Sequence, residues 1–168
     1  GGSLQEPKPH KLLLLLAILD LSEEGHLVEN RIYFDERLIA LFEKYFRQYA
    51  NEGDWFQPGP PYFHLRSSDF WHHKVREGRE QNYAKLTTSG GGTKRIIENI
   101  EYAYLSPDVY EVVSNPTARS ELRNFIKLQL DDYSSKELNM SEETPKRIGT
   151  MFHETFSLSR PAIGAVIS

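Results

Sequence analysis

The sequence contains no cysteine and no apolar run long enough to cross a membrane. Without cysteine the chain can form neither a disulfide bond nor a cysteine-ligated zinc site, which fits the reducing cytoplasm where we expect it. The apolar run of residues 12–19 ends at Asp20 and is far shorter than the about 20 residues that a membrane span needs. No small-residue cleavage site follows this run, so it predicts a buried helix rather than a signal peptide.

Recognisable catalytic motifs are missing as well. Gly90–Gly92 follow no strong strand and lack the Gly-Lys-Ser/Thr ending of a phosphate loop. There is no serine nucleophile elbow and no nuclease motif of the His-Asn-His or Asp/Glu-x-Lys type. His72 and His73 are adjacent, so a strand would point them to opposite faces, where they cannot easily share a metal ion. The sequence therefore predicts a binding protein rather than an enzyme, with no metal and no cofactor.

The net charge of −4 weighs mildly against nucleic-acid binding, but the charge is unevenly distributed. Residues 62–95 contain seven Lys and Arg against three Asp and Glu, a net charge of +4, whereas residues 1–61 and 96–168 each carry −4. A local basic zone can bind phosphates on an acidic protein, because the contacts depend on the local field. An uneven solvated surface gives the same distribution, so charge alone leaves both interpretations open.

The pattern of apolar residues predicts a predominantly helical α+β domain. The expected helices cover residues 10–24, 36–50, 93–104, 107–114, 116–133 and 141–156. Short strands are expected at 62–66 and 70–75, an extended piece at 31–34, a loop at 51–61, a polar turn at 77–81 and a linker at 131–139. We expect a helical bundle joined to a short β-hairpin, in a winged-helix-like arrangement.

The first segment with binding chemistry directly precedes the buried helix. It reads Lys8-Pro9-His10-Lys11. Basic side chains and the free N–H groups at a helix N-terminus together attract phosphates. A solubilising entry to an apolar helix would have the same composition, so both interpretations stay open.

The second segment joins two prolines to a run of aromatic residues. It reads Pro60-Pro61-Tyr62-Phe63-His64-Leu65-Arg66 and continues to Phe70-Trp71. On a strand His64 and Arg66 would share one face, because side chains alternate along the backbone. We expect Pro61, His64 and Arg66 to lie outside the core, and we expect Phe63, Leu65 and Trp71 to be part of it.

In order and spacing, these segments resemble the DNA sulfur-binding domain family. The shared features are Pro9-His10-Lys11 followed by Leu12–Leu16, a second helix, and a Pro-aromatic-x-x-Leu segment that leads to Trp71, over residues 7–133. In that family the domain recognises phosphorothioate DNA in McrA-like, type IV modification-dependent restriction endonucleases, often ahead of an HNH nuclease. The resemblance implies a bacterial cytoplasmic protein that binds double-stranded phosphorothioate DNA and allows a fused or associated nuclease.

The resemblance also implies a shallow apolar pocket for the sulfur atom. The implied pocket residues are Pro61, Pro60, Tyr62, His64 and Lys11. Sulfur is larger than oxygen and a poorer hydrogen-bond acceptor, so an apolar pocket that leaves an oxygen without partners, at a cost of about 1–3 kcal/mol, favours sulfur. The expected contacts to DNA phosphates and bases come from Lys8, His10, Lys11, Arg66, His72, Lys74, Arg76, Lys85, Thr87, Thr88, Ser89, Lys94 and Arg95.

The sequence departs from the family pattern in two places. Pro60-Pro61-Tyr62 stands where Tyr-Pro-Phe is usual, and Ser68-Asp69-Phe70 replaces an Asp-Gly before the tryptophan, which can reshape the pocket or alter the preferred sequence. We expect residues 1–6 to be a tag or disordered start, 7–156 a single DNA-binding domain and 157–168 an irregular tail. The alternatives are a divergent metal-dependent nuclease, a protein-interaction domain of a restriction complex, and a winged-helix transcription factor indifferent to sulfur.

Overall fold

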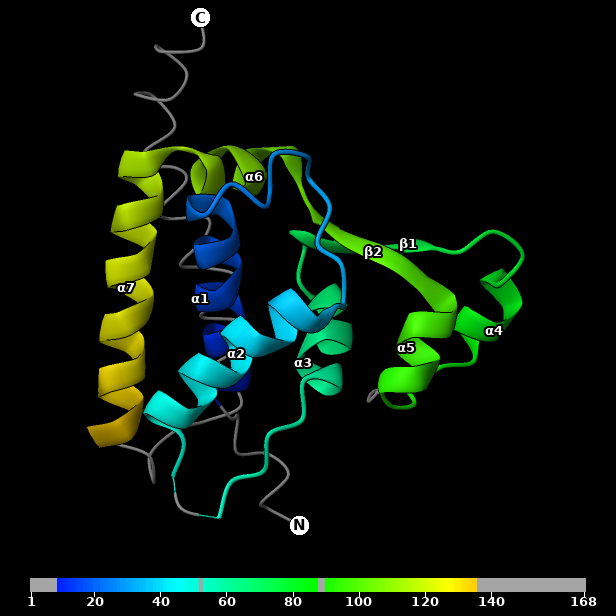
Figure 1. Cartoon of the computed structure of the whole chain (residues 1–168), viewed down its shortest axis with the longest axis horizontal. Helices are drawn as coiled ribbons and strands as arrows, with labels where there is room; N and C mark the ends of the chain where they lie inside the picture. The colour runs from blue at the N-terminus through cyan, green and yellow to red at the C-terminus, as the bar shows by residue number, and fades with distance from the viewer. Residues whose placement is uncertain (1–8, 52, 88–89, 136–168) are drawn as a thin grey trace, which may run out of the picture.

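A computed structural model of the chain describes residues 9–51, 53–87 and 90–135. Its helical body is built around α1 (His10–Glu23), whose residues from Leu12 to Leu21 are all buried. This helix is apolar on every side, and it is accordingly covered by α2 (Glu36–Tyr49), α6 (Pro107–Ser114) and α7 (Pro116–Ser135) (Figure 1).

The helices that cover α1 begin where the sequence supplies capping residues. Asp35 accepts a hydrogen bond from the Leu38 N–H at 3.0 Å and so caps α2. Pro107 occupies the first turn of α6, where a missing N–H costs little. Asn115 accepts a bond from the Ala118 N–H at 2.8 Å, immediately before the long α7. These local signals fix where the helices start.

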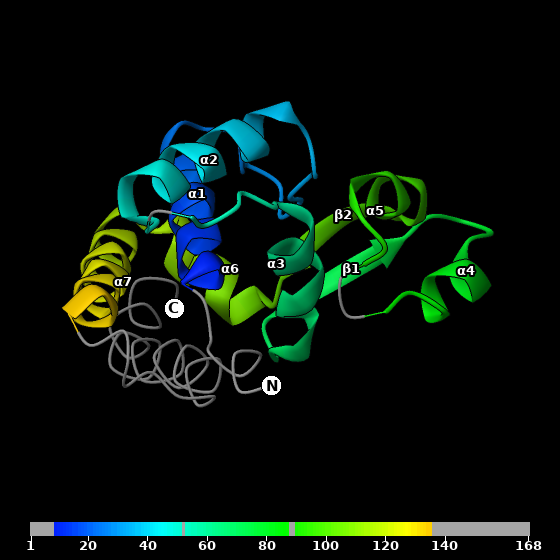
Figure 2. The same ribbon diagram turned by 90° about the horizontal axis from the view of Figure 1, so that it is seen from below.

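A smaller arm extends from one side of the helical body. Its sheet pairs β1 (Trp71–Val75) with β2 (Ile100–Leu105) in antiparallel register, and a single bridge adds Ile32 beside Ala103. The short helix α3 (Gly59–His64) and the 3₁₀ turn η2 (Leu65–Ser67) lie between the sheet and the body (Figure 2).

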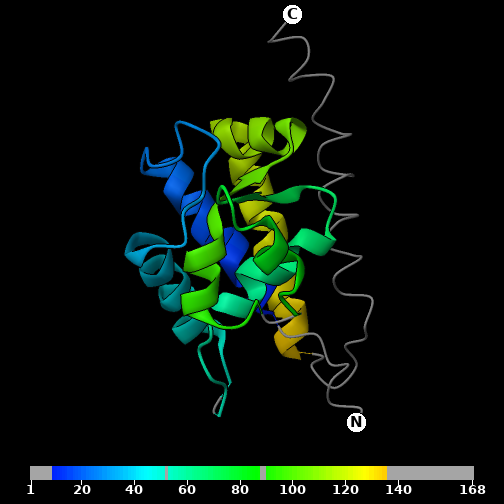
Figure 3. The same cartoon turned by 90° about the vertical axis from the view of Figure 1, so that its right-hand side faces the viewer.

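The far end of the arm consists of two short helices, α4 (Glu80–Ala84) and α5 (Thr93–Asn99). Figure 3 looks along the arm, so that these helices face the viewer and the body lies behind them. Among the described residues, no helix combines the length and the apolar character that crossing a bilayer requires.

The structure confirms the helix-dominated α+β class and four of the expected helices. Those helices are α1, α2, α6 and α7, the last of which runs two residues beyond the expected end. The expected linker at 131–139 is wrong over residues 131–135, which are still part of α7, and the rest of that linker and the helix at 141–156 lie outside the described residues. The terminal segments 1–6 and 157–168 lie outside them too.

The expected β-hairpin is wrong. Residues 62–64 belong to α3 and 65–67 to η2, because Pro60 and Pro61 occupy the first turn of a helix. The helix expected at 93–104 ends at residue 99, and residues 100–105 instead form β2, which is the partner of β1. Residues 80 and 81 of the expected turn begin α4. Because β1 pairs with β2 across a connection that contains α4 and α5, and not with a strand at residues 62–66, the winged-helix-like arrangement is not confirmed.

Candidate nucleic-acid interface

The N-terminus of α1 presents two basic side chains. Pro9 is the residue before the helix, and its side chain makes no capping hydrogen bond. The first N–H groups of a helix have no partner within the helix, which makes the start of α1 favourable for an anion. The His10 ring packs edge-on against Phe46, with 5.3 Å between centroids. Lys11 is half-buried, and this burial lowers its pKa.

Helix α3 is anchored by its aromatic residues. The Tyr62 hydroxyl donates to the Ile32 carbonyl at 2.7 Å, and the Trp71 indole N–H donates to the Tyr62 carbonyl at 2.8 Å. Tyr62 and Phe63 are both fully buried. Burial raises the pKa of the Tyr62 hydroxyl, so this group stays a neutral donor. A short helix held from two sides in this way presents its remaining surface in a fixed position.

Lys11, His64 and Arg66 form a polar cluster that carries two positive charges, although Lys11 and His64 are 53 positions apart in the sequence. Helix α1 packs against α3, and η2 follows α3 directly. Burial lowers the pKa of His64, and the positive charges of Lys11 and Arg66 lower it further. His64 is therefore a neutral imidazole at pH 7, beside two cations.

Arg66 is exposed but held by two aromatic rings. Its guanidinium carbon lies 4.1 Å from the centre of the Phe63 ring and 5.4 Å from that of Tyr83. The Tyr83 hydroxyl is in turn 2.8 Å from Nδ1 of His73. Sequence reasoning missed Tyr83, because no local pattern indicates that its ring packs against Phe63 and Arg66.

The glycine-rich loop joins the same surface. Gly90 has a φ of +76°, and a Cβ at this position would stand 2.9 Å from Cγ of Phe63. A Cβ on Gly59 would stand 3.1 Å from Cδ1 of Ile96 in α5. Glycine at both positions therefore lets α3, the loop and α5 pack closely. Two segments that are distant in the sequence, α1 and residues 90–96, therefore pack against α3.

No family model and no curated protein matches this chain. The interface is therefore described by its own residues. In the part of the chain that the structure describes, no group of three or more His, Asp or Glu residues is arranged to hold a metal ion.

Burial corrects part of the expected sulfur pocket. Pro61 is buried, so the expectation that it lies outside the core is wrong. Tyr62 is fully buried with its hydroxyl bonded, which leaves it no free surface for a ligand. Pro60, His64 and Lys11 are half-buried and remain available. The helix explains this outcome, because successive residues of α3 turn toward the core instead of alternating as on a strand.

Several expected DNA contacts lie in the chain on either side of the glycine loop, which packs against Phe63 of α3. Lys85, Thr87, Lys94 and Arg95 are exposed, and they flank the glycine loop on both sides. Lys8, Thr88 and Ser89 lie outside the described residues.

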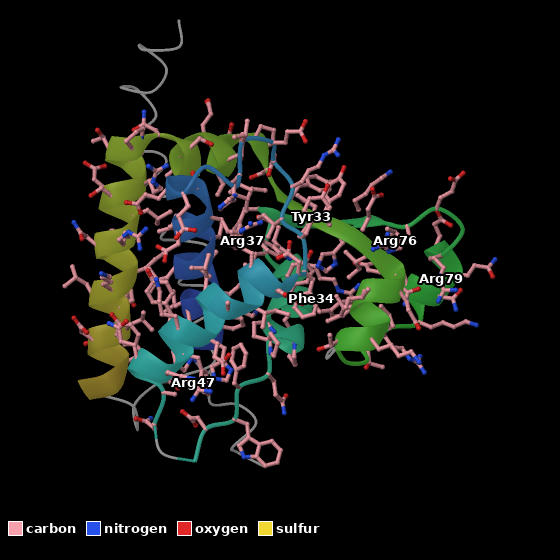
Figure 4. The ribbon with its side chains drawn as sticks, viewed as in Figure 1. Tyr33, Phe34, Arg37, Arg47, Arg76 and Arg79 are labelled. Atoms are coloured by element: carbon pink, nitrogen blue, oxygen red, sulfur yellow. The ribbon has the colours of Figure 1, made fainter. Side chains whose placement is uncertain are left out.

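Other expected contacts lie elsewhere on the arm. On β1, Trp71 and His73 face α3, whereas the His72 ring packs 5.3 Å from Tyr104 on the opposite face, which Lys74 shares. Arg76 donates to the Ile97 carbonyl at 2.8 Å and lies with Arg79 near the end of the arm (Figure 4). The structure thus separates these side chains from the cluster around α3.

Proposed function

We propose that this chain binds double-stranded DNA and recognises a phosphorothioate in its backbone at the surface formed by α1 and α3. The observation that carries the proposal is that Lys11 and Arg66 both lie close enough to His64 to lower its pKa, and that half-buried Pro60 lies about one helical turn before His64 in α3. Such a surface offers charge for phosphates and a poorly solvated patch for one backbone atom.

The chemistry of the cluster favours sulfur over oxygen at its centre. Pro60 contributes an apolar ring, and Lys11 contributes its aliphatic stem, since this side chain is half-buried. His64 is neutral because its pKa is lowered, so it adds little attraction for a hard, charged oxygen. An oxygen held there loses hydrogen bonds that sulfur scarcely needs. Buried Pro61 acts as a support that holds Pro60 and His64 in place.

Neighbouring phosphates are assigned to the basic residues around this centre. His10 and the N-terminus of α1 are assigned to one phosphate, and the segments that flank the glycine loop are assigned to another. The side chains assigned to phosphates and groove edges near α3 are Lys85, Thr87, Lys94, Arg95 and Arg66. His72, Lys74 and Arg76 would reach DNA only where the duplex extends along the arm. No cofactor takes part, and cleavage in a restriction system is left to a fused or associated nuclease.

The test compares two pools of fluorescein-labelled duplexes by anisotropy. Both pools have random bases around one central linkage, which is a phosphorothioate in one pool and a phosphate in the other. We expect at least about fivefold tighter binding of the sulfur pool, because each unmet hydrogen bond costs about 1–3 kcal/mol and about 1.4 kcal/mol is tenfold. Pro60→Ala and His64→Ala should reduce this preference and leave the binding of unmodified DNA nearly unchanged.

Two further variants test the contribution of charge. Lys11→Ala should weaken both pools and reduce the salt slope by about one, and it should also lower the preference for sulfur, because it removes the stem that lines the patch. Lys127→Ala, on α7 and away from α3, should change neither. A preference for sulfur below about threefold would be smaller than the loss of one hydrogen bond predicts, and it would refute recognition of the modification. Metal-dependent cleavage of either pool would instead indicate a nuclease.

A further inference from the structure

The two-stranded sheet of the arm has two different faces. Trp71 and His73 of β1 face α3, where their ring centroids lie 5.5 Å and 5.8 Å from that of Tyr62. Their partners on β2 are Leu105 and Ala103, which are buried on the same face. Because side chains alternate along a strand, the neighbouring residues of each strand lie on the outer face, away from α3. These residues are His72, Lys74, Tyr102 and Tyr104.

A third segment of the chain adds to this outer face. The Ile32 N–H donates to the Ala103 carbonyl at 2.7 Å, and the Ala103 N–H donates to the Ile32 carbonyl at 2.8 Å. The Asn30 side chain holds the same segment by bonding both the N–H and the carbonyl of Leu105. Ile32 is fully buried, so the residues on either side of it point outward. These two exposed residues are Arg31 and Tyr33, of which Tyr33 lies beside β2 in Figure 4.

The rings of Tyr33, Tyr102, Tyr104 and His72 form a continuous row, which we call the tyrosine face. Tyr102 stands within the row, with its centroid 5.7 Å from that of Tyr33 and 6.3 Å from that of Tyr104. The Tyr104 ring is in turn 5.3 Å from that of His72 on β1. Tyr33 is 43% exposed and Tyr104 is 37% exposed. Edge-to-face contacts with Tyr102 hold these two rings in place, and part of each remains open to a ligand.

Positive charges lie among the rings of the tyrosine face. The guanidinium carbon of Arg31 is 5.0 Å from the centre of the Tyr102 ring. Lys74 is exposed and is paired with Tyr102 across the sheet. The carboxylate of Glu29 is 3.8 Å from Arg31 in an exposed ion pair, and such pairs contribute little stability. Arg31 can therefore exchange Glu29 for a phosphate of a ligand.

We propose that the tyrosine face binds the unpaired bases of a single-stranded nucleic acid. The rings of Tyr33 and Tyr104 stack on bases, while Arg31 and Lys74 contact the phosphates that join them. The inference goes beyond the proposed function and does not rest on it, since the tyrosine face lies on the side of the sheet away from α3.

The combination of rings and cations favours this class of ligand. Single-strand sites join aromatic rings that stack on bases to positive charge that follows the backbone, and a sheet with exposed rings is a known platform for two or three bases. Bases inside a duplex already stack on one another, so their faces are closed to these rings. A proline-rich peptide also docks on aromatic side chains, but its prolines offer nothing to Arg31 and Lys74.

The test compares labelled oligomers of about twelve nucleotides by anisotropy. Oligodeoxythymidine and oligouridine carry bases, whereas an abasic oligomer of the same length keeps only the sugar-phosphate backbone. We expect at least one base-bearing oligomer to bind at least about fivefold more tightly than the abasic one, which is the lower end of the range for stacking of one base. These oligomers contain neither a duplex nor sulfur, so a failure here leaves the proposed function standing.

Variants of the tyrosine face separate stacking from charge. Tyr33→Ala and Tyr104→Ala should each weaken the base-bearing oligomer at least about fivefold and leave the abasic oligomer unchanged, whereas Tyr33→Phe, which keeps the ring, should bind as the wild type does. Lys74→Ala should weaken all the oligomers and reduce the salt slope by about 0.7. Leu128→Ala is the matched control, because Leu128 is 67% exposed but lies on α7. Thermal melting of each variant by circular dichroism checks that it folds.

Three results would overturn the inference. The first is that neither base-bearing oligomer binds more tightly than the abasic one. The second is that Tyr33→Ala and Tyr104→Ala both fold and keep the preference for bases, because the bases then bind elsewhere. The third is a protein occupant: without base-dependent binding, labelled polyglutamate that Tyr33→Ala binds more weakly would show an acidic peptide site, and a dimer that Tyr33→Ala dissociates would show an interface between copies.

Discussion

Replacing Asp20 by asparagine should destabilise the protein by about 3 kcal/mol at pH 7. Asp20 is only 7% exposed and joins three helices of the body. Its carboxylate accepts from Nζ of Lys44 at 2.8 Å, from the Tyr45 hydroxyl at 2.9 Å and from the Arg123 guanidinium at 2.9 Å. The asparagine keeps the shape of the side chain but removes its charge and replaces one acceptor oxygen with an NH2 donor, so the loss includes hydrogen bonds as well as the ionic contacts.

The magnitude follows from the exposure of the partners. The side chain of Arg123 is 17% exposed, and removing one member of a buried pair costs about 3–5 kcal/mol. Arg123 keeps its second partner, Glu23, at 2.6 Å, which places the expected loss at the lower end of that range. Lys44 is 54% exposed, so its part of the loss is small. For a chain of this size, about 3 kcal/mol lowers Tm by roughly 6–12 °C.

The loss should also depend on pH. Burial raises the pKa of Asp20, but hydrogen bonds from Lys44, Tyr45 and Arg123 and the charge of Arg123 outweigh it and hold the pKa below its ordinary value. A carboxylate with a lowered folded pKa stabilises the protein above its unfolded pKa of about 3.9, and this stabilisation is lost as pH falls through the folded pKa. The difference between wild type and Asp20→Asn should therefore be constant from pH 7 to about 5 and shrink below about 4.

Urea unfolding followed by circular dichroism at several pH values measures both effects. The control is Glu43→Gln, which removes the carboxylate from the exposed pair with Arg47 and should cost at most about 0.5 kcal/mol. The reasoning is refuted if Asp20→Asn costs no more than this control. It is also refuted if the loss is the same at pH 3 as at pH 7.

Two further measurements test the packing beside α3. Gly90→Ala should cost at least about 1 kcal/mol more than Gly92→Ala in urea unfolding, because both have positive φ but only Gly90 would push a Cβ into Phe63. Equal losses would contradict that close contact. The pKa of His73, which burial lowers to about 4, should appear as a midpoint near pH 4 in an NMR titration of its ring. Since unfolded histidine takes up its proton near pH 6.5, stability should fall as pH drops from about 6.5 to 4 and then level off, and an NMR midpoint near 6.5 would contradict the burial.

The helical body could be predicted from the sequence because its signals are local. The apolar run of α1 and the capping residue Asp35 act within a few residues, as do Pro107 and Pro116 at the starts of α6 and α7. Helix α2 also buries apolar residues that recur at helical spacing, among them Leu38, Phe42 and Tyr45. The bounds of α1, α2 and α6 accordingly agree with the expected ones to within one residue.

The arm could not be predicted in the same way, because its sheet depends on pairing between distant residues. Trp71 is paired with Leu105, and the Ile32 bridge to Ala103 brings in a third segment. Ile100–Leu105 lies directly after α5, where the apolar residues also fit a continued helix, so only the pairing with β1 decides its conformation. In the 60–66 segment, Pro60 and Pro61 are compatible with a loop as well as with the first turn of a helix.

The candidate site shows the same division between local and distant information. Lys11, His64 and Arg66 were each expected at the interface from their segments, but their mutual position depends on the packing of α1 against α3. No pattern in the sequence predicts that Arg66 rests on Tyr83 of α4. The expectation that Pro61 lies outside the core failed because it assumed a strand, on which every second residue faces outward.

The burial of Pro61 changes how selectivity for sulfur can arise on this surface. With Pro61, Tyr62 and Phe63 packed inward, α3 cannot shift to fit a ligand without breaking the bonds of Tyr62 to Ile32 and of Trp71 to Tyr62. Under the proposed function, recognition of sulfur would come from what α3 leaves at its surface, which is the ring of Pro60 and the neutral imidazole of His64. A rigid, weakly polar patch between fixed cations loses little entropy on binding and offers an oxygen few hydrogen bonds. The buried aromatic residues would then contribute to the proposed selectivity by preventing α3 from adapting to ordinary phosphate.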